Sequence, residues 1–295
     1  DPRVLTSDDI WKMEKLPSSL AVVGGGVIGC ELASIFASFG VKVTIYEMMP
    51  RILPEQDDEI VSLAEKFFQQ RGIQISPGKP VENLDRIKEE KVLLAIGRKA
   101  RITSFQDRGL ATENGAVKVD QFLQTNLPSV YAAGDVNGRY QFAYVATREG
   151  LVAAANIMGK RMAIDYENLP VSIFTNPEIA SCGFTERQAK NQGIPVKLGR
   201  FPFSALGRAK AEGKTDGLVK VIAEAETLRI LGIHIIGGQA TELVATATFI
   251  LKNRLSALEV EKVFFCHPTF SEAIMEAAAD AAGQCFHLPP LKNAT

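Results

Sequence analysis

A glycine-rich stretch between an apolar run and an amphipathic segment constrains the fold of this chain more than any other feature. Residues 20–23 predict a short buried strand, which leads directly into Gly24-Gly25-Gly26-Val27-Ile28-Gly29. Helically spaced apolar residues follow up to Gly40, and a second predicted strand over residues 41–46 ends in Glu47. Strand, G-x-G-x-x-G, helix, strand and acidic residue in this order predict a Rossmann βαβ unit that binds a dinucleotide.

Each residue of this fingerprint has a separate physical role. Gly24 permits the tight turn, Gly26 lets the backbone approach a pyrophosphate, and Gly29 lets helix and strand pack closely. The helix N-terminus adds amide donors and a positive dipole. Glu47 is placed to accept hydrogen bonds from an adenosine ribose and to repel a 2′-phosphate, which favours NAD over NADP. Glu31 has two interpretations: a carboxylate favoured in the first turn of a helix, or a group beside a nicotinamide.

The rest of the first hundred residues continues the α/β pattern and then loses it. An acidic helix over about 57–70 and a strand over 73–75 form a third unit, and an apolar strand follows over 92–96. The polar stretch 76–90 has no clear period and is too short for another helix and strand with their turns. We expect it to be a linker or a place where residues are missing.

A second nucleotide signature lies in the middle of the chain. Residues 127–135 predict a turn and a short buried strand that ends in Gly134-Asp135, and a helix is expected over about 142–158. An acid at the C-terminal end of a strand, beside a helix start, lies where α/β sheets hold ligands. The competing interpretation is that Asp135 only caps a turn.

From about residue 166 the pattern of expected secondary structure changes. Short strands are expected over 171–174 and 179–183, a helix from about Thr185, and a hairpin over 217–236 that turns near Glu226. Two Ala-rich helices over about 239–253 and 270–282 can pack closely against a partner chain, although a monomeric α+β domain is the alternative. Phe201, Phe203 and Phe249 are expected in the core.

The segment His267-Pro268-Thr269-Phe270-Ser271-Glu272 holds a candidate catalytic pair. The imidazole titrates near neutral pH, so it can take a proton from a thiol and return it. The carboxylate of Glu272 can hold the other ring nitrogen and stabilise the imidazolium. Thr269 and Glu272 also match a T-x-x-E capping box at the start of a helix, and the two interpretations can coexist.

Composition excludes several classes of function. With 295 residues, 46% of them hydrophobic, and a net charge of −1, the chain can bury a large core and has no basic footprint for nucleic acid. No apolar run approaches the roughly 20 residues that span a bilayer, so we expect no membrane segment. The four cysteines are not spaced as a metal site or as a close redox pair, which favours a reducing compartment; they are Cys30, Cys182, Cys266 and Cys285.

Five motifs in this order make the sequence resemble the flavoprotein disulfide reductases. They are the fingerprint Gly24 to Glu47, the run Leu94-Ala95-Ile96-Gly97-Arg98, the block Ala133-Gly134-Asp135, the segment Phe174 to Gly183 with Asn176-Pro177-Glu178, and His267-Pro268-Thr269 with Glu272. His234-Ile235-Ile236-Gly237 is similar to the interface domain of that family. Within the family, the chain looks most like the dihydrolipoamide dehydrogenases.

The resemblance implies a fold class, a division into domains and a set of ligands. The fold is an α/β Rossmann-type NAD-binding domain over residues 1–97, the C-terminal part of an FAD domain over 98–165, and an α+β dimerisation domain over 166–295. FAD and NAD are the implied cofactors, with Asp135 at the ribityl chain of the flavin, Glu31 beside the nicotinamide, and Gly97 as a further cofactor-binding residue. His267, followed by a cis peptide bond to Pro268, would act in the active site of the other subunit of a homodimer.

The implied reaction is oxidation of protein-bound dihydrolipoamide with NAD as hydride acceptor. The implied partners are the lipoyl domains and E2 core of a 2-oxoacid dehydrogenase complex, in a bacterial cytoplasm or a mitochondrial matrix. This chemistry needs two neighbouring cysteines, which the family carries as a C-x4-C pair after an earlier glycine-rich FAD loop. Neither is present in this sequence, so most of the FAD domain is expected to lie outside it and the chain alone to be inactive.

Two further alternatives stay open. The chain could be a nucleotide-binding and dimerising fragment without disulfide reductase activity. It could also come from another member of the family, such as a glutathione or mercuric reductase. Glu47 argues against the NADP-linked glutathione reductases, and the isolated Cys285 argues against a C-terminal cysteine pair of the mercuric reductase kind.

Overall fold

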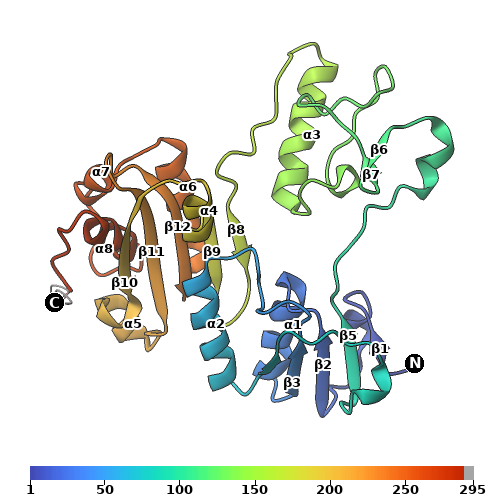
Figure 1. Cartoon of the computed structure of the whole chain (residues 1–295), viewed down its shortest axis with the longest axis horizontal. Coiled ribbons are helices and arrows are strands. Elements are labelled where there is room, and N and C mark those ends of the chain that lie inside the picture. Colours follow the sequence, from blue (N-terminus) through green and yellow to red (C-terminus); the bar gives the residue numbers. More distant parts are fainter. Residues whose placement is uncertain (289–295) are drawn as a thin grey trace. The chain divides into compact units, whose positions relative to one another are not determined.

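The computed structural model describes residues 1–288, without the side chains of Ser104, Gln106 and Asp107. The chain forms two compact units (Figure 1): Asp1–Ile96 folds together with the part of the chain from Glu167 onward, and Gly97–Tyr166 is a unit of its own. The division into three functional domains stays a prediction, and its first and third segments share one compact unit.

A parallel sheet forms the first half of the larger unit. Its strands, in spatial order, are β1 (Val4–Leu5), β5 (Lys91–Leu94), β2 (Ser19–Val23), β3 (Lys42–Tyr46) and β4 (Gln74–Ser76). The central strands are apolar runs because both faces of a parallel sheet are covered. The β2–β3 connection contains the fingerprint helix α1 (Val27–Ser38), so the predicted βαβ unit is present.

Helix α2 (Asp58–Gln70) lies between β3 and β4 in the sequence, and its N-terminal cap and apolar spacing explain why this stretch is helical. Asp57 precedes it, and its side chain accepts a hydrogen bond from the backbone N–H of Glu59, which caps the first turn. Ile60, Ala64 and Phe68 recur at helical spacing and are buried in the same core as the parallel sheet. The stretch 76–90 contains only one short 3-10 helix, η2 (Leu84–Arg86), between its two strands, as expected of a linker.

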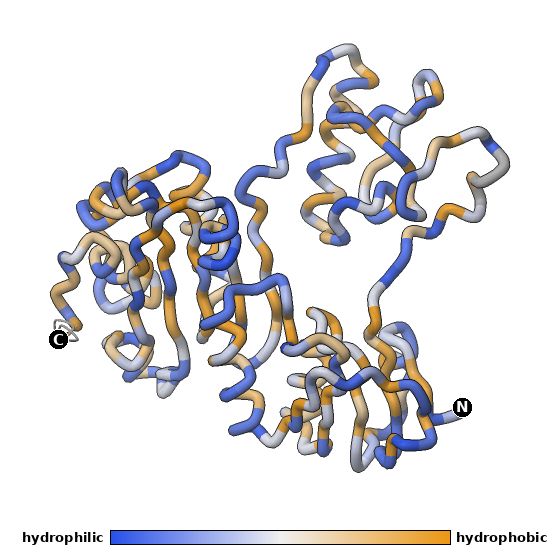
Figure 2. The backbone as a smooth tube through the Cα atoms, viewed as in Figure 1, coloured by the Kyte–Doolittle hydropathy of each residue, from blue (hydrophilic) through white to orange (hydrophobic). Residues whose placement is uncertain are grey.

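An antiparallel sheet forms the second half of the larger unit. Its strands, in spatial order, are β10 (Val196–Pro202), β11 (Gly217–Glu224), β12 (Ile230–Gly237), β9 (Ile179–Gly183) and β8 (Val171–Ile173). Figure 2 shows β11 and β12 as largely apolar runs. Val219 and Ile235 point into a core with helices α6 (Ala240–Lys252) and α8 (Glu272–Ala281).

The alternate residues of the same strands point to the opposite face, toward the first half of the unit. Leu218 and Ile236 are buried in the core of the parallel sheet. Four polar residues form a row across this face in register: Arg200, Lys220, His234 and Ser181. Ser181 Oγ donates to Gln56 Oε1 over 2.8 Å, so this row joins the two halves.

Shorter elements connect these layers. They are η1 (Ile10–Lys12), α4 (Glu186–Asn191), η5 (Phe203–Ala205), α5 (Gly207–Glu212) and α7 (Ala257–Glu261). Thr185 caps α4 through a complete capping box with Gln188, which is where the sequence predicts a helix to begin. No helix in the described part of the chain is both long enough and apolar enough to cross a membrane.

The smaller unit contains one long helix and several tight turns. Its elements are η3 (Thr103–Arg108), β6 (Thr112–Glu113), β7 (Ala116–Val117), η4 (Asp135–Asn137) and α3 (Ala143–Ile157). Val117, Leu123 and Val152 form its core. The helix predicted over about 142–158 is present as α3.

Two expectations are wrong. Instead of a buried strand before Gly134, the chain forms a single bridge between Tyr131 and Gln124, and Val130 is exposed, because this segment pairs only with the adjacent turn in the described part of the chain. Phe249 lies on the outer face of α6 with 73% of its surface exposed, although its spacing predicted a core residue. Four strands were not predicted from the sequence: β1, β10, and β6 and β7 of the smaller unit.

Candidate functional site

The glycine loop has the geometry of a phosphate-binding turn. Gly24 has a φ of +109°, and a Cβ on it would lie 2.4 Å from the carbonyl oxygen of Ala95. A Cβ on Gly29 would lie 2.0 Å from the carbonyl oxygen of Gly24, so the helix packs here directly on the turn. Around Gly26 no atom lies within 4 Å of such a Cβ. Gly26 therefore faces open space, as the approach of a ligand requires.

Glu47 holds this loop from the end of β3. Its Oε2 accepts a hydrogen bond from the backbone N–H of Gly25 over 2.6 Å, and its Oε1 accepts one from Met49 over 2.7 Å. The residue is only 7% exposed, yet each oxygen keeps further lone pairs for a ribose hydroxyl. No side chain caps the N-terminus of α1 beside it, so its first N–H groups can meet a phosphate.

Glu31 has a structural partner. Its Oε1 accepts the backbone N–H of Phe174 over 2.9 Å, and Ser34 Oγ accepts that of Asn176 over 2.9 Å. Burial raises the pKa of the Glu31 carboxyl, although the hydrogen bond from Phe174 opposes this. The side chain therefore fastens α1 to the segment that follows β8, a contact which neither interpretation of the sequence foresaw.

His267 and Glu272 form a hydrogen-bonded pair. Nδ1 of His267 lies 2.8 Å from Oε1 of Glu272, and the peptide bond between His267 and Pro268 is cis, as predicted. A carboxylate only accepts, so Nδ1 carries the hydrogen and Nε2 is left to take a proton. The His267 side chain is 74% exposed, whereas that of Glu272 is 16% exposed.

Glu272 also completes half of the predicted capping box. Its Oε2 accepts the backbone N–H of Thr269 over 2.7 Å, while the Thr269 hydroxyl donates to the carbonyl of Cys266. The reciprocal bond to the helix is absent, because α8 begins after Ser271 without a side-chain cap. One carboxylate thus orients the imidazole and fixes the loop before α8.

Asp135 lies in the smaller unit, as the first residue of η4. Gly134 before it has a φ of +79°, and the Asp135 side chain is exposed. In the part of the chain that the structure describes, its carboxylate makes no hydrogen bond or ion pair, so it does not cap the turn by its side chain. Gly97 lies at the other end of this unit with a φ of +107°.

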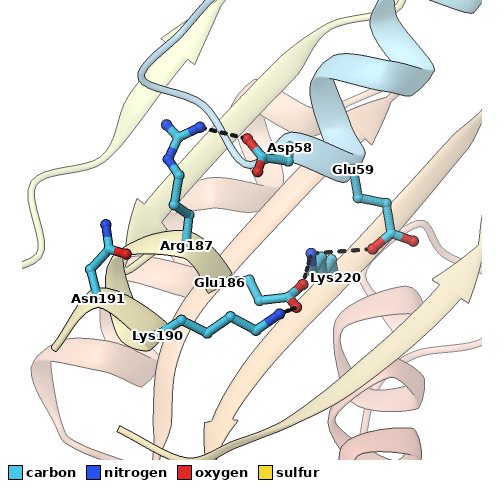
Figure 3. A pocket seen from close by; sticks show the side chains of 7 residues that line it. All are labelled: Asp58, Glu59, Glu186, Arg187, Lys190, Asn191 and Lys220. Atoms are coloured by element: carbon cyan, nitrogen blue, oxygen red, sulfur yellow. Dashed lines mark hydrogen bonds and ion pairs between the residues drawn. The ribbon is translucent and has the colours of Figure 1, made fainter. Parts of the chain in front are cut away.

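A buried lysine joins the two halves of the larger unit (Figure 3). Lys220 Nζ lies 2.8 Å from Asp57 Oδ1, 2.8 Å from Glu186 Oε2 and 3.2 Å from Glu59 Oε2, and its side chain is 1% exposed. Arg200 adds a bond to Glu59. Lys220, Glu59 and Glu186 line a cavity of about 330 Å³ together with Asp58, Arg187, Lys190 and Asn191. Sequence analysis missed this cluster.

The protonation states of the cluster follow from its pairing. Burial acts to raise the pKa of Asp57, but the hydrogen bond from Lys220 and the nearby positive charges bring it below the ordinary value. Hydrogen bonds from Lys190 and Lys220 lower the pKa of Glu186. Burial acts to lower the pKa of Lys220, and its carboxylate partners raise it overall. Positive and negative charges on the lining balance, so the cluster connects the two halves rather than attracting one kind of ion.

One cysteine contacts the glycine loop, since Cys30 Sγ donates to the carbonyl of Gly25 over 3.3 Å. All four are free, and burial raises the pKa of Cys30, which packs in the core as expected. Among the described residues no group of three His, Cys, Asp or Glu side chains could hold a metal ion.

The structure brings together the fingerprint glycines, Glu31 and Glu47 around the N-terminus of α1. It also brings together His267 and Glu272, in the antiparallel half of the same unit. The larger unit thus combines a glycine loop with the geometry of a dinucleotide site and, in its other half, a histidine–carboxylate pair with the geometry of an oriented base.

Comparison with known families gives the class a name. Residues 1–150 match the pyridine nucleotide-disulphide oxidoreductase model, and residues 169–278 match the dimerisation domain of the same group. The chain belongs to the pyridine nucleotide-disulphide oxidoreductase family, whose members are FAD-dependent, and its dimerisation domain supports a homodimer.

Individual relatives agree with this assignment. The chain is 40% identical to a dihydrolipoyl dehydrogenase of Bacillus subtilis over 96% of its own length and 65% of the relative. It is 36% identical to that of Chlamydia pneumoniae over 98% of its own length and 66% of the relative. The chain thus spans just under two thirds of the length of these relatives.

Solved structures give the same fold. The flavoprotein disulfide reductase RclA of Escherichia coli superimposes with a TM-score of 0.89 at 28% identity, over 94% of this chain and 67% of that one. LpdA of Mycobacterium tuberculosis superimposes with a TM-score of 0.86 at 25% identity, over 93% and 64%. The predicted fold class is confirmed.

Proposed function

We propose that the chain is the nicotinamide-binding and dimerising part of an NAD-linked flavoprotein that oxidises protein-bound dihydrolipoamide. The observation that carries this is the bond between His267 Nδ1 and Glu272 Oε1, which leaves an exposed Nε2 as a base for a thiol. The dihydrolipoyl dehydrogenases among its relatives support the substrate. The lipoyl domains and E2 core of a 2-oxoacid dehydrogenase complex are then its partners, in a bacterial cytoplasm or a mitochondrial matrix.

The residues of this chain have defined tasks in that reaction. His267 Nε2 takes the proton of a substrate thiol, and the Glu272 carboxylate stabilises the resulting imidazolium. Flavin, when bound, supplies the two-electron step between the dithiol and the nicotinamide. The exposed carboxylate of Asp135, which has no partner among the described residues, suits a chain of ligand hydroxyls, and Gly97 is a further cofactor-binding residue.

The fingerprint holds the nicotinamide dinucleotide. The pyrophosphate lies against Gly24, Gly26 and the N-terminus of α1, and Glu47 accepts the ribose hydroxyls. Glu31 lies beside the nicotinamide with Oε2, because Oε1 is used by the backbone N–H of Phe174.

A homodimer places His267 in the active site of the other subunit. Several large apolar side chains of the antiparallel half are exposed, as a partner surface requires: Phe174, Phe249, Val263 and Phe264.

A second candidate is a nucleotide-binding and dimerising fragment without reductase activity. The sequence favours it in one respect, since it has no C-x4-C pair to exchange with a lipoyl disulfide. We propose that the chain alone does not turn over dihydrolipoamide. Turnover by the purified 295-residue chain would contradict this, and no observation specifically favours a glutathione or mercuric reductase.

Titration of the purified chain with NADH and NADPH tests the nucleotide assignment. We expect NADH to bind at least tenfold more tightly than NADPH, and Glu47→Ala to remove most of this preference. Glu82→Ala, which changes an exposed glutamate of the same unit, is the control and should behave like the wild type. Equal affinities for the two nucleotides in the wild type would show that the ribose assignment is wrong.

A further inference from the structure

A buried carboxylate lies behind the Gly134–Asp135 turn. Glu149, in the middle of α3, is fully buried at 0% exposure. Its Oε2 accepts the backbone N–H of Gly134 over 2.5 Å and the side-chain amide of Asn137 over 2.8 Å. Its Oε1 accepts the hydroxyl of Tyr166 over 2.5 Å. Three donors from two separate segments thus meet one carboxylate.

Burying a carboxylate completely costs free energy unless its oxygens accept hydrogen bonds. An ionised group inside a protein is tolerated when its hydrogen bonds are satisfied, and here all three donors serve the charged form. Burial, followed by the bond to Glu149, raises the pKa of the Tyr166 hydroxyl, so Tyr166 stays a donor at neutral pH. In this hydrogen bond Tyr166 is therefore the donor and Glu149 the acceptor.

The turn that Glu149 holds has two backbone hydrogen bonds of its own, from Asn137 N–H to the Gly134 carbonyl over 3.0 Å and from Gly138 N–H to the Asp135 carbonyl over 3.1 Å, but neither uses the Gly134 N–H. Gly134 has a φ of +79°, and a Cβ on it would lie 3.1 Å from that of Ala146 on α3. Its N–H is a buried donor, and no helix or strand ladder supplies an acceptor for it. Asn137 continues the network, because its Oδ1 accepts the backbone N–H of Arg139 over 3.0 Å. Both ends of the turn around Asp135 are thus fixed by one side chain.

We propose that Glu149 is a positioning residue which holds the Gly134–Asn137 turn in its ligand-ready form and so aims Asp135 at the hydroxyl-rich chain of the flavin. This rests on the proposed function, in which Asp135 meets FAD. Glu149 does not touch the flavin itself. It acts before the ligand arrives, by fixing a turn whose free form would have to be ordered on binding.

Two substitutions separate hydrogen bonding from charge. Glu149→Leu keeps the bulk but leaves Gly134 N–H and Asn137 Nδ2 without an acceptor. Glu149→Gln can keep those two bonds through its amide oxygen and can donate its NH₂ to the Tyr166 oxygen. Tyr166→Phe removes only the bond to Oε1. Arg148→Leu, at the exposed position next to Glu149, is the matched control.

Amide hydrogen exchange and FAD titration of the full chain test the proposal together. In Glu149→Leu we expect the Gly134 amide to exchange at least tenfold faster and FAD to bind at least tenfold more weakly. Glu149→Gln, Tyr166→Phe and the control should stay within threefold of the wild type in both measurements. The amides around Val152 of α3 show whether any loss is local or due to unfolding of the unit.

Four results would overturn the proposal. Unchanged amide exchange at Gly134 in Glu149→Leu would show that Glu149 does not hold the turn. Faster exchange with unchanged FAD affinity would show that the conformation of the turn does not affect flavin binding. If Glu149→Leu unfolds the unit, Glu149→Gln decides, and a tenfold loss of FAD affinity in that variant would contradict the role of the hydrogen bonds. Because most of the FAD domain is expected to lie outside the chain, the flavin role of Asp135 is read from a comparison: equal FAD affinity of the wild type and of Asp135→Ala, with a protected Gly134 amide in both, would contradict that role, and the positioning role with it.

Discussion

Glu272 lies 2.8 Å from Nδ1 of His267 through one carboxylate oxygen, and its other oxygen anchors the backbone of the same loop at Thr269. The carboxylate is mostly buried while the imidazole is mostly exposed. The loop is thus built so that the fixed partner orients the accessible one. A histidine held in this way keeps its tautomer and direction when its substrate approaches.

Removing the carboxylate should loosen this loop. In Glu272→Ala the Thr269 amide loses its acceptor, so we expect its hydrogen exchange to rise about tenfold and the free energy of unfolding to fall by about 1–2 kcal/mol. His267→Ala removes the imidazole but not the bond to Thr269, and the Thr269 amide should keep its protection. Equal protection of that amide in the wild type and in Glu272→Ala would disprove the anchoring role.

Local patterns in the sequence predict this site better than they predict the contacts between its layers. The fingerprint and the His267–Glu272 pair each lie within a short stretch, so spacing alone is enough to find them. Lys220 and Asp57 are 163 residues apart, and each is an ordinary surface residue type in its own segment. Only the packing of β11 against α2 makes them partners.

The missed strand β10 has a similar cause. Gly199 interrupts its apolar pattern, because α8 packs so closely that a Cβ there would lie 1.8 Å from the carbonyl oxygen of Ala277. Glu149 was missed because a single acid in an Ala-rich helix resembles a solvent-facing residue. The prediction for Phe249 failed in the opposite direction, because a large apolar side chain on a helix can lie on an exposed face as well as in the core.

Replacing the buried lysine should destabilise the larger unit strongly. Lys220→Met leaves Asp57, Glu59 and Glu186 without their shared cation, so we expect a loss of about 3–5 kcal/mol in the free energy of unfolding. Lys190→Met removes an exposed ion pair with Glu186 and should cost no more than about 1 kcal/mol. Urea denaturation at pH 7 measures both, and equal losses would mean that burial adds nothing to the pairing.

The same cluster predicts how stability depends on pH. Asp57, Glu59 and Glu186 have lowered pKa values in the folded state, so their contribution is complete above about pH 4.5, near the unfolded values, and is lost as pH falls through the folded values. Burial also lowers the pKa of His234 below 6.5, so protonation of the unfolded chain costs stability from about pH 6.5 downward. The loss of folding stability on acidification therefore has two stages.

His234→Gln separates the two stages. We expect the free energy of unfolding of this variant still to fall below about pH 4.5. Between about pH 6.5 and pH 5 it should no longer depend on pH, since glutamine does not titrate. Urea midpoints measured at half-unit intervals from pH 8 to pH 3.5 resolve both regions. A wild-type stability that is flat between pH 6.5 and pH 5 would show that the histidine is not buried as a neutral group.

The glycine loop offers the sharpest separation of binding from folding. Gly26 has an extended backbone, and no atom lies within 4 Å of a Cβ built on it. The free energy of unfolding of Gly26→Ala should therefore lie within about 0.5 kcal/mol of the wild-type value. The new methyl group lies on the face where the pyrophosphate has to approach, so NADH affinity should fall at least tenfold. In Gly29→Ala the methyl group meets the carbonyl oxygen of Gly24 at 2.0 Å, and stability itself should fall by more than about 2 kcal/mol. Thermal unfolding and NADH titration of the two variants give this contrast directly, and a Gly26→Ala chain that binds NADH normally would mean that the nucleotide does not lie against this loop.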